Sequence, residues 1–533
     1  MQPLELVILL LVVVLAAATG ARRLGLPYPI FLVLVGLALG VAPRVPAVEL
    51  EPDLVFLVFL PPILWAAAYF TSFRDFRANL RPIGLLAIGL VLATTAAVAT
   101  VAVALLPGIG WPAAIALGAI VSPPDAVAAT AIAGRLGLPR RVVTILEGES
   151  LVNDATALVL YRTAVAAAVT GAFSPIGALR DFALAAGLGI AIGLAVGRLA
   201  SLALGATRDA MVEIAITLLA PYVAWVASER LHASGVLACV AGGLAIRRYF
   251  PTLVAPETRL QARAVWDLVV FLLNGVVFVL IGLQIAALRR TLPEGDLRPL
   301  LVAAAAVTAT LMAVRMAWVP LAAWLPRRLS ASLRMRDPMP PRGALVLISW
   351  IGMRGIVSLA AALALPHVTA AGLPFPQRDE IVLVTFAAVL ATLLLPGLSL
   401  PWLVRHLSLP SDTQRTREES QARTQAALVA LRRLDELASE AWVSGEHAER
   451  MRSVYQERLR RAAAFGSPPG ESDDVGLRRL YHEVLSAERR AVVDLRDAGV
   501  VADEVLHQIE KEIDVESVRS GVGEWRMRGG RNE

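Results

Sequence analysis

The sequence contains almost no cysteine and almost no lysine. Cys239 is the single cysteine and lies in an apolar run, so disulfide frameworks and cysteine-based metal sites within one chain are excluded. Lys511 is the single lysine, and the excess of arginine beside abundant alanine indicates a compositional bias. No Walker-type phosphate loop precedes a predicted helix, and no cluster of histidine and cysteine has zinc-site spacing. ATP-driven machinery and zinc chemistry are therefore not expected.

Long apolar runs, by contrast, are abundant. Of the 533 residues 57% are hydrophobic and the mean hydropathy is +0.65, whereas soluble domains are about 45–50% apolar. The runs have about the 20 residues that a membrane-spanning helix requires. We therefore predict an all-α integral membrane protein with about 13 transmembrane helices. Hydropathy places them at 4–20, 27–42, 53–70, 82–106, 111–133, 141–170, 178–204, 210–231, 233–247, 264–288, 298–325, 342–366 and 379–405.

Charged residues are distributed unevenly between the two parts of the chain and between successive loops. Residues 411–533 carry 20 basic and 24 acidic side chains, a net charge of −4. The whole chain has a net charge of +6, so residues 1–410 carry a net charge of +10. Arginine is concentrated in alternate loops, such as those containing Arg22, Arg140 and Arg327. The positive-inside rule puts these loops in the cytoplasm. We expect a plasma-membrane protein with its N-terminus outside and its C-terminal tail inside, and the basic excess does not indicate nucleic-acid binding.

Two predicted spans are interrupted by residues that break helices. The fifth contains Ser-Pro-Pro-Asp at 122–125, and the twelfth contains Gly-Met-Arg-Gly at 352–355. Proline removes a backbone donor, and glycine loosens the helical ladder. Because the breaks lie seven spans apart, spans 1–6 and 8–13 would form two inverted six-helix repeats joined by span 7. Paired broken helices in such repeats mark a transporter's binding site, where they cross near the bilayer midplane.

The sixth predicted span contains three acids within eight residues, in the segment Glu-Gly-Glu-Ser-Leu-Val-Asn-Asp. A carboxylate at the bilayer centre costs roughly 2.5–3.5 kcal/mol or more, which favours a functional role. Glu147, Ser150 and Asp154 share one helical face at i, i+3 and i+7, and Glu149 and Asn153 form a second stripe beside it. This oxygen-rich surface suits a proton or a small hard cation.

Asp154 is the primary candidate for binding that ion. Burial in the bilayer favours its neutral, protonated form, whereas a nearby cation favours the carboxylate. One carboxyl group can thus hold a proton or a metal cation, and this competition couples two fluxes. The alternative is a carboxylic acid that only packs helices, bonded to a neighbouring serine or backbone group.

Several motifs in one order resemble the monovalent cation:proton antiporter-1 family, the group of bacterial and eukaryotic sodium–proton exchangers. They lie at 122–128, 148–154, 234–238, 271–284 and 352–355, and the likeness covers roughly residues 1–405. The resemblance implies a homodimeric secondary antiporter that exchanges a monovalent cation for H⁺ by alternating access, for pH and sodium homeostasis. Na⁺ is the expected cation and K⁺ the alternative, with no cofactor beyond the transported ions.

Two rival classes stay open. A gated cation channel would need a continuous polar pore, whereas the polar residues are confined to a few central positions. An intramembrane enzyme could use Asp125 and Asp154 as a carboxylate pair, but no nucleophile or metal cluster accompanies them. Both comparisons favour a carrier.

The resemblance also implies roles for individual residues. Asp154 would carry the cation and the proton, and Asp125 would be a second site residue, with Na⁺ held by Asp154, Asp125 and Ser150. The Ser150 hydroxyl could equally bond a carbonyl of its own helix. The Asn153-Asp154 pair resembles the pair found in family members thought to be electroneutral. In these exchangers a single carboxylate would exchange one cation for one proton. The alternative role of Asn153 is a hydrogen bond between helices.

A buried arginine needs a carboxylate partner, because an unpaired charge is expensive in the bilayer. For Arg354 we predict Glu149, a pairing that the resemblance also implies. Glu149 and Arg354 would then support the site without binding the ion. Glu147 lies nearer the arginine-rich end of its helix and is expected to form an interfacial pair with Arg140 or Arg141.

Two positions depart from the family pattern. Pro124 stands directly before Asp125 and can offer only its carbonyl, so any side-chain ligand expected there is missing. Trp65 follows a Leu-Pro-Pro sequence at the point where some relatives carry an acid, which argues against a site role for the third span. We divide the chain into a membrane domain at 1–409 and a cytoplasmic helical tail at 410–533, either a packing or dimer-supporting domain or a regulatory one.

Overall fold

The protein is helical throughout the part of the chain that the structure describes. The computed structural model describes residues 3–42, 51–125, 130, 138–171, 175–291, 297–407, 413–440 and 442–464, and short stretches after residue 479. The only β pairing in these ranges is an isolated bridge between Val368 and Pro374. The all-α class predicted from the sequence is confirmed.

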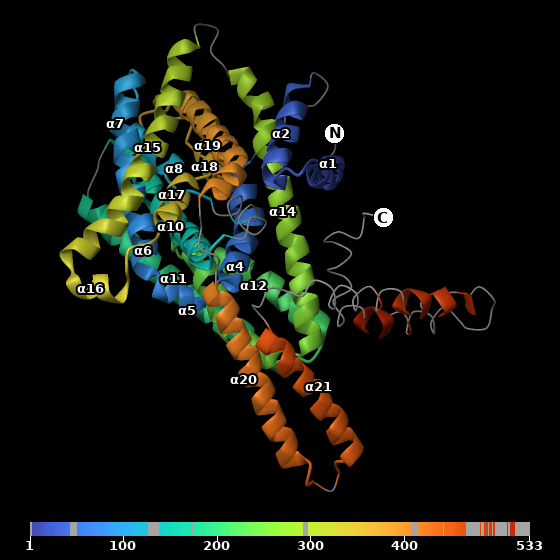
Figure 1. Cartoon of the computed structure of the whole chain (residues 1–533). Coiled ribbons are helices and arrows are strands. Elements are labelled where there is room, and N and C mark those ends of the chain that lie inside the picture. The colour runs from blue at the N-terminus through green and yellow to red at the C-terminus, as the bar shows by residue number, and fades with distance from the viewer. Residues whose placement is uncertain are drawn as a thin grey trace. The chain divides into compact units, whose positions relative to one another are not determined.

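The chain divides into two compact units, Met1–Ser411 and Asp412–Glu533. Figure 1 shows the course of the chain. The helices of the first unit are α1 (Pro3–Leu24), α2 (Tyr28–Val41), α3 (Pro52–Leu54), η1 (Val55–Phe59), α4 (Leu60–Phe70), α5 (Phe73–Ala78), α6 (Leu80–Gly84), η2 (Leu85–Leu90), α7 (Val91–Leu105), α8 (Gly110–Val121), α10 (Arg140–Thr170), α11 (Pro175–Ala206), α12 (Ala210–Arg230), α13 (Gly235–Leu253), α14 (Pro256–Thr291), α15 (Arg298–Leu329), α16 (Ala331–Arg336), α17 (Arg342–Trp350), α18 (Ile356–Leu363) and α19 (Arg378–His406).

Eight helices in the described ranges are long and apolar enough to cross a membrane. They are α1, the continuous helices 52–70 and 80–105, α11, α12, α14, α15 and α19, and α2 and α8 are shorter apolar helices. Leucines on α11, among them Leu184, Leu194 and Leu199, are exposed, as expected for a surface that faces lipid. The multi-pass membrane class follows from these helices, and the full count of thirteen spans stays a prediction.

Both predicted helix breaks are present, and they lie against each other. Helix α8 ends at Val121, and the residues from Ser122 to Asp125 are not helical. The second break separates α17 from α18 between Trp350 and Ile356. The Asp125 amide donates a hydrogen bond to the Met353 carbonyl at 2.7 Å, which joins the two breaks directly. The rest of the fifth predicted span, 126–133, lies outside the described residues except for Thr130.

Helix α10, which carries the acidic segment, packs against α8, η2, α6, α13, α4 and α17. Its approach to α5 and α6 depends on Gly148. A Cβ atom there would collide with the Ile83 side chain and press against the Phe76 ring at 3.3 Å. The glycine between the two glutamates therefore allows the helix to lie deep in the bundle.

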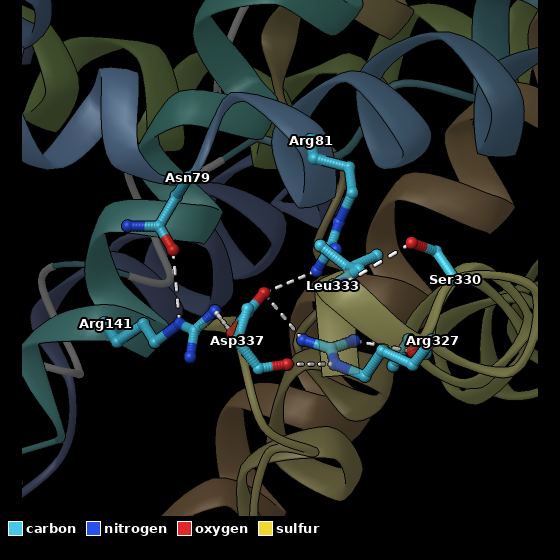
Figure 2. A network of polar contacts seen from close by, with 8 residues as sticks. Asn79, Arg81, Arg141, Arg327, Ser330, Leu333 and Asp337 are labelled. Atoms are coloured by element: carbon cyan, nitrogen blue, oxygen red, sulfur yellow. Dashed lines mark hydrogen bonds and ion pairs between the residues drawn. The ribbon is translucent and has the colours of Figure 1, made fainter. Parts of the chain in front are cut away.

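One end of the bundle is tied together by a group of polar side chains that we call the Asp337 cluster: Asp337, Arg81, Arg141, Arg327 and Asn79 (Figure 2). The Asp337 carboxylate accepts from Arg81 at 2.5 Å and from Arg141 and Arg327 at 2.8 Å each. The Asn79 side chain accepts from Arg141 at 3.1 Å. The cluster thus joins α6, α10, α15 and the segment before α17.

The second unit contains α20 (Thr413–Leu437) and α21 (Gly445–Ala464), which pack side by side. The Ser420 hydroxyl donates to the Ala462 carbonyl at 2.8 Å, and Arg452 forms an ion pair with Asp435 at 2.7 Å. Both contacts join residues far apart in the sequence, so the two helices form a hairpin.

Candidate ion-binding site

Three of the predicted site residues meet in one cavity. The cavity has a volume of about 390 Å³ and is lined by residues of α2, α4, α10, α14, α18 and the two helix breaks. Asp125, Ser150 and Asp154 all line it. The wall is otherwise mainly apolar, with Phe271 and Phe278 among its members. A small ion in this space would find its oxygen ligands at a few defined positions.

The Asp154 carboxylate is nearly enclosed and yet lacks a protein partner. Its residue is 7% exposed. Among the residues that the structure describes, none forms a hydrogen bond or an ion pair with Asp154, although it lines the cavity. A buried carboxylate without a partner is costly unless it binds a proton or a cation. This is the arrangement that an ion carrier requires.

The second break holds the Asp125 carboxylate. A Cβ atom on Gly355 would collide with Asp125 Oδ2 and would lie 2.7 Å from its Cγ. Only a residue without a side chain leaves room for this carboxylate at the start of α18. Gly355, the second glycine of the Gly-Met-Arg-Gly sequence, therefore allows the Asp125 carboxylate to approach the backbone, in addition to interrupting the helix.

Asn153 lies outside the cavity lining. It is fully buried, and its amide nitrogen donates to the Pro124 carbonyl at 2.9 Å. Its side-chain oxygen has no hydrogen-bond partner in the described part of the chain. The contact is the helix-to-helix hydrogen bond considered as its alternative role, and it ties α10 to the first break, one residue before Asp125.

The predicted ion pair between Glu149 and Arg354 is wrong in its basic partner. Glu149 is bound by Arg315 of α15 through two parallel contacts, Nη1 to Oε1 at 2.5 Å and Nη2 to Oε2 at 2.8 Å. Both residues are buried, at 1% and 2% exposure. The two planar groups match in this geometry, so the carboxylate is fully engaged.

Arg354 instead satisfies its guanidinium on main-chain carbonyls. It donates to Val121 at 3.0 Å, to Ser122 at 3.5 Å and to Gly352. The two helix breaks leave these carbonyls without helical partners, which provides acceptors that a continuous helix would not offer. Arg354 therefore holds the breaks together, and it does not need the Glu149 carboxylate for this.

Sequence reasoning missed Arg315. The available signal was its position near the middle of the apolar run 298–325, because an arginine there is costly unless it is paired. The prediction for Glu147 was also wrong. Arg140 pairs with Asp75 and Arg141 with Asp337, whereas Glu147 lines the cavity. Trp65 is buried and does not line this cavity, but other residues of the third predicted span, among them Leu60 and Ile63, do line it.

Comparisons of the sequence with known protein families and with individual relatives agree on one class of protein. Residues 8–406 match the model of the family described as sodium/hydrogen exchanger, transmembrane. An uncharacterized Na⁺/H⁺ exchanger of Mycobacterium tuberculosis is 38% identical over 96% of each chain. A sodium, potassium, lithium and rubidium/H⁺ antiporter of Bacillus pumilus is 35% identical over 75% of this chain and 61% of the relative.

The fold has a solved counterpart. The sodium proton antiporter MjNhaP1 of Methanocaldococcus jannaschii superimposes with a TM-score of 0.59 at 18% identity, over 76% of this chain and 99% of that one. The family match spans the helices that build the cavity, both breaks and the acidic segment. The chain belongs to the transmembrane sodium/hydrogen exchanger family.

Proposed function

We propose that the protein is a secondary antiporter that exchanges Na⁺ for H⁺ by alternating access, with Asp154 as the carrier of both ions. The observation that carries the proposal is the Asp154 carboxylate, buried in a cavity with Asp125 and Ser150 and without a protein partner. Family membership and the relatives named as Na⁺/H⁺ exchangers support the same activity.

The charges of the site favour a one-for-one exchange. The Glu149 carboxylate is paired with Arg315, whereas the buried Asp154 carboxylate lines the cavity without a partner in the described part of the chain. One bound proton or one bound Na⁺ changes the charge of Asp154 by the same single unit. The two loaded forms therefore carry equal charge, so a full cycle moves no net charge.

In this proposal the other residues divide into ligands and supports. Asp125 and Ser150 line the cavity with Asp154 and would complete the oxygen shell of Na⁺. Asn153 fixes α10 to the first break, Arg354 joins the two breaks, and the Glu149–Arg315 pair holds α10 against α15. None of these supporting residues lines the cavity.

The wider architecture is part of the same proposal. We infer thirteen spans in two inverted repeats, a homodimer in the plasma membrane, and the arginine-rich loops and the tail on the cytoplasmic side. The direct bond between the breaks at Asp125 and Met353 supports the crossing of two broken helices. With this orientation, the cavity region near Glu147 and Asp267 faces the cytoplasm.

K⁺ is the second candidate, because the Bacillus pumilus relative carries a name that includes potassium. Inside-out membrane vesicles with an imposed pH gradient separate the possibilities when Na⁺, K⁺ or Li⁺ is added singly. We expect Na⁺ to dissipate the gradient. A response to K⁺ alone would change the assigned cation, and no response to any of the three would reject antiport.

The same vesicles test coupling. A neutral exchange should dissipate the pH gradient without changing the membrane potential, and clamping the potential should leave the rate unchanged. A gated channel would carry current and would respond to the potential. A potential-dependent rate would therefore contradict the neutral exchange.

A further inference from the structure

The ion cavity contains more carboxyl groups than the site needs. Besides Asp125 and Asp154, it is lined by Glu147 of α10 and Asp267 of α14. These acids differ in exposure. The Asp267 side chain is 63% exposed and pairs with Arg263 of the same helix at 3.8 Å, Glu147 is partly buried, and Asp154 is 7% exposed. In order of decreasing exposure, Asp267, Glu147 and Asp154 form a series.

Glu147 holds the middle of this series. It lies seven residues before Asp154 on the same face of α10, about 10 Å away along the helix axis at 1.5 Å per residue. Both side chains line the same cavity. A cation that enters past Asp267 therefore meets Glu147 before it reaches Asp154.

The charge of Glu147 is not cancelled by a neighbouring base. Arg140 and Arg141, less than two turns away on α10, are occupied by Asp75 and Asp337. No basic side chain in the described part of the chain forms an ion pair with Glu147, which has a polar contact with Thr71. A partly buried acid without a counter-charge is rare unless it binds something.

The contact with Thr71 leaves the Glu147 oxygens available. The Thr71 hydroxyl has one proton, and it donates to the Ala67 carbonyl at 2.8 Å. Its distance to Glu147 Oε2 is 3.5 Å, at the limit of a hydrogen bond. The hydroxyl oxygen and the carboxylate therefore lie close together as two acceptors. Thr71 is 2% exposed and does not line the cavity, whereas Glu147 does, so the hydroxyl would complete the ligand shell of a cation at Glu147 from the protein side.

We propose that Glu147 and Thr71 form a second cation-binding position on the access path, which holds a monovalent cation before it moves to Asp154. The inference rests on the proposed exchange of Na⁺ for H⁺. The position raises the local concentration of the cation beside the carrier. It therefore sets the Na⁺ concentration needed for half-maximal exchange and leaves the maximal rate nearly unchanged.

The test compares Glu147→Gln with the wild-type protein in inside-out vesicles across a series of Na⁺ concentrations. Removal of one negative charge about 10 Å from the carrier should raise the half-maximal Na⁺ concentration on the order of tenfold at an effective dielectric constant of about 20. The maximal rate should stay within about twofold, because Asp154 is intact. Glu147→Asp keeps the charge and should recover most of the affinity.

Glu257→Gln is the matched control. Glu257 lies in the first turn of α14, is exposed, and does not line the cavity. The same chemical change there should leave the half-maximal concentration unchanged. Thr71→Val, which removes the hydroxyl at nearly constant shape, should raise it about two- to threefold, in keeping with the loss of a neutral ligand.

The outcomes separate the two proposals. A wild-type protein that does not respond to Na⁺ would reject the proposed function itself. An active wild type with an unchanged half-maximal concentration in Glu147→Gln would reject the second position alone. A lower maximal rate at unchanged half-saturation would assign Glu147 a structural role and overturn the proposal. Should Glu147→Gln fail to reach the membrane, an unchanged half-saturation in Thr71→Val overturns it instead.

Discussion

Two carboxyl groups on α10, five residues apart, have opposite surroundings. Glu149 is 1% exposed and is bound by both terminal nitrogens of Arg315. Asp154 is 7% exposed and has no hydrogen-bond or ion-pair partner in the described part of the chain. The first faces a neighbouring helix, and the second faces a cavity. Burial alone therefore does not distinguish the proposed carrier from Glu149, whereas the cavity and the absence of a partner do.

The difference follows from the helical period. Glu149 and Asn153 lie four residues apart on the face that meets the breaks and α15, and both form defined contacts there. Ser150 and Asp154, also four apart, lie on the face that lines the cavity. One helix thus combines a rigid polar attachment with the proposed ion-binding surface, and each can be removed separately.

The largest expected effect comes from Asp154→Asn. The amide has nearly the same shape but cannot exchange a proton for a cation, so Na⁺-dependent dissipation of the pH gradient should fall to background. Because Asp154 makes no stabilising contact, the variant should fold and reach the membrane in normal yield. Vesicle assays and size-exclusion profiles in detergent measure the two properties.

Asp379→Asn provides the control for this variant. Asp379 lies in the first turn of α19, and its side chain is 61% exposed. Its replacement should leave exchange unchanged. Retained exchange in Asp154→Asn would move the carrier role to another residue, and Asp125 would be the next to test.

The opposite pattern is expected for the Glu149–Arg315 pair. Removal of one partner leaves an uncompensated buried charge, which costs about 3–5 kcal/mol. Glu149→Gln and Arg315→Met should each lower the thermal unfolding midpoint in detergent and the membrane yield strongly. Exchange per folded molecule should be reduced much less than in Asp154→Asn.

The double variant Glu149→Gln/Arg315→Met distinguishes a lost pair from general damage. It removes both charges, so its stability should exceed that of at least one single variant. If the two single effects simply add, the charges do not interact as the structure has them. If Arg354→Met shows the stronger coupling to Glu149, the original prediction of that pair would be restored.

Gly355→Ala probes the contact between the two breaks. The added Cβ would collide with the Asp125 carboxylate and displace it or α18. Overpacking of this kind typically costs about 1–3 kcal/mol. We expect a moderately lowered unfolding midpoint and a clear loss of Na⁺ affinity, because Asp125 is a proposed ligand. Gly187→Ala is the matched control, since a Cβ there meets no atom within 4 Å. An unchanged Na⁺ affinity in Gly355→Ala would argue against Asp125 as a ligand.

The sequence could predict features that depend on local pattern. The breaks at 122–125 and 352–355 follow from proline and glycine, and the separation of Asp154 from Glu149 follows from the helical period. The all-helical membrane class follows from hydropathy. Each of these is a property of a short segment, and the structure confirms the breaks and the class.

Partner choice between distant segments could not be predicted in the same way. Three arginines, Arg140, Arg141 and Arg354, were assigned to acids that bind other groups or none. Arg315 is 166 residues from Glu149 in the sequence, so no spacing rule relates them. Arg354 was assigned a carboxylate because carbonyls freed by the breaks cannot be counted before the breaks are placed together.

The smallest expected effect is at Asp337, which has three arginine partners but lies outside the membrane-spanning helices with a side chain 24% exposed. Asp337 thus combines charged partners with access to water, which Glu149 lacks. Since solvent screens such pairs, Asp337→Asn should cost only about 1 kcal/mol or less, far below the cost at Glu149. Burial alone would raise the pKa of the Asp337 carboxyl, but Arg141, Arg327 and Arg81 hold that pKa below its ordinary value of 3.8.

The lowered pKa fixes the direction of the pH effect. A carboxyl whose pKa is lower in the folded than in the unfolded state adds stability above the unfolded value and loses it as the pH falls through the folded value. The difference in unfolding midpoint between wild type and Asp337→Asn should therefore be constant from roughly pH 8 to pH 5 and should shrink below about pH 4. A difference that grows on acidification would show that the carboxyl is protonated more readily in the folded protein. The three arginines would then not stabilise its charge, and exposure rather than the number of partners would explain its contrast with Glu149.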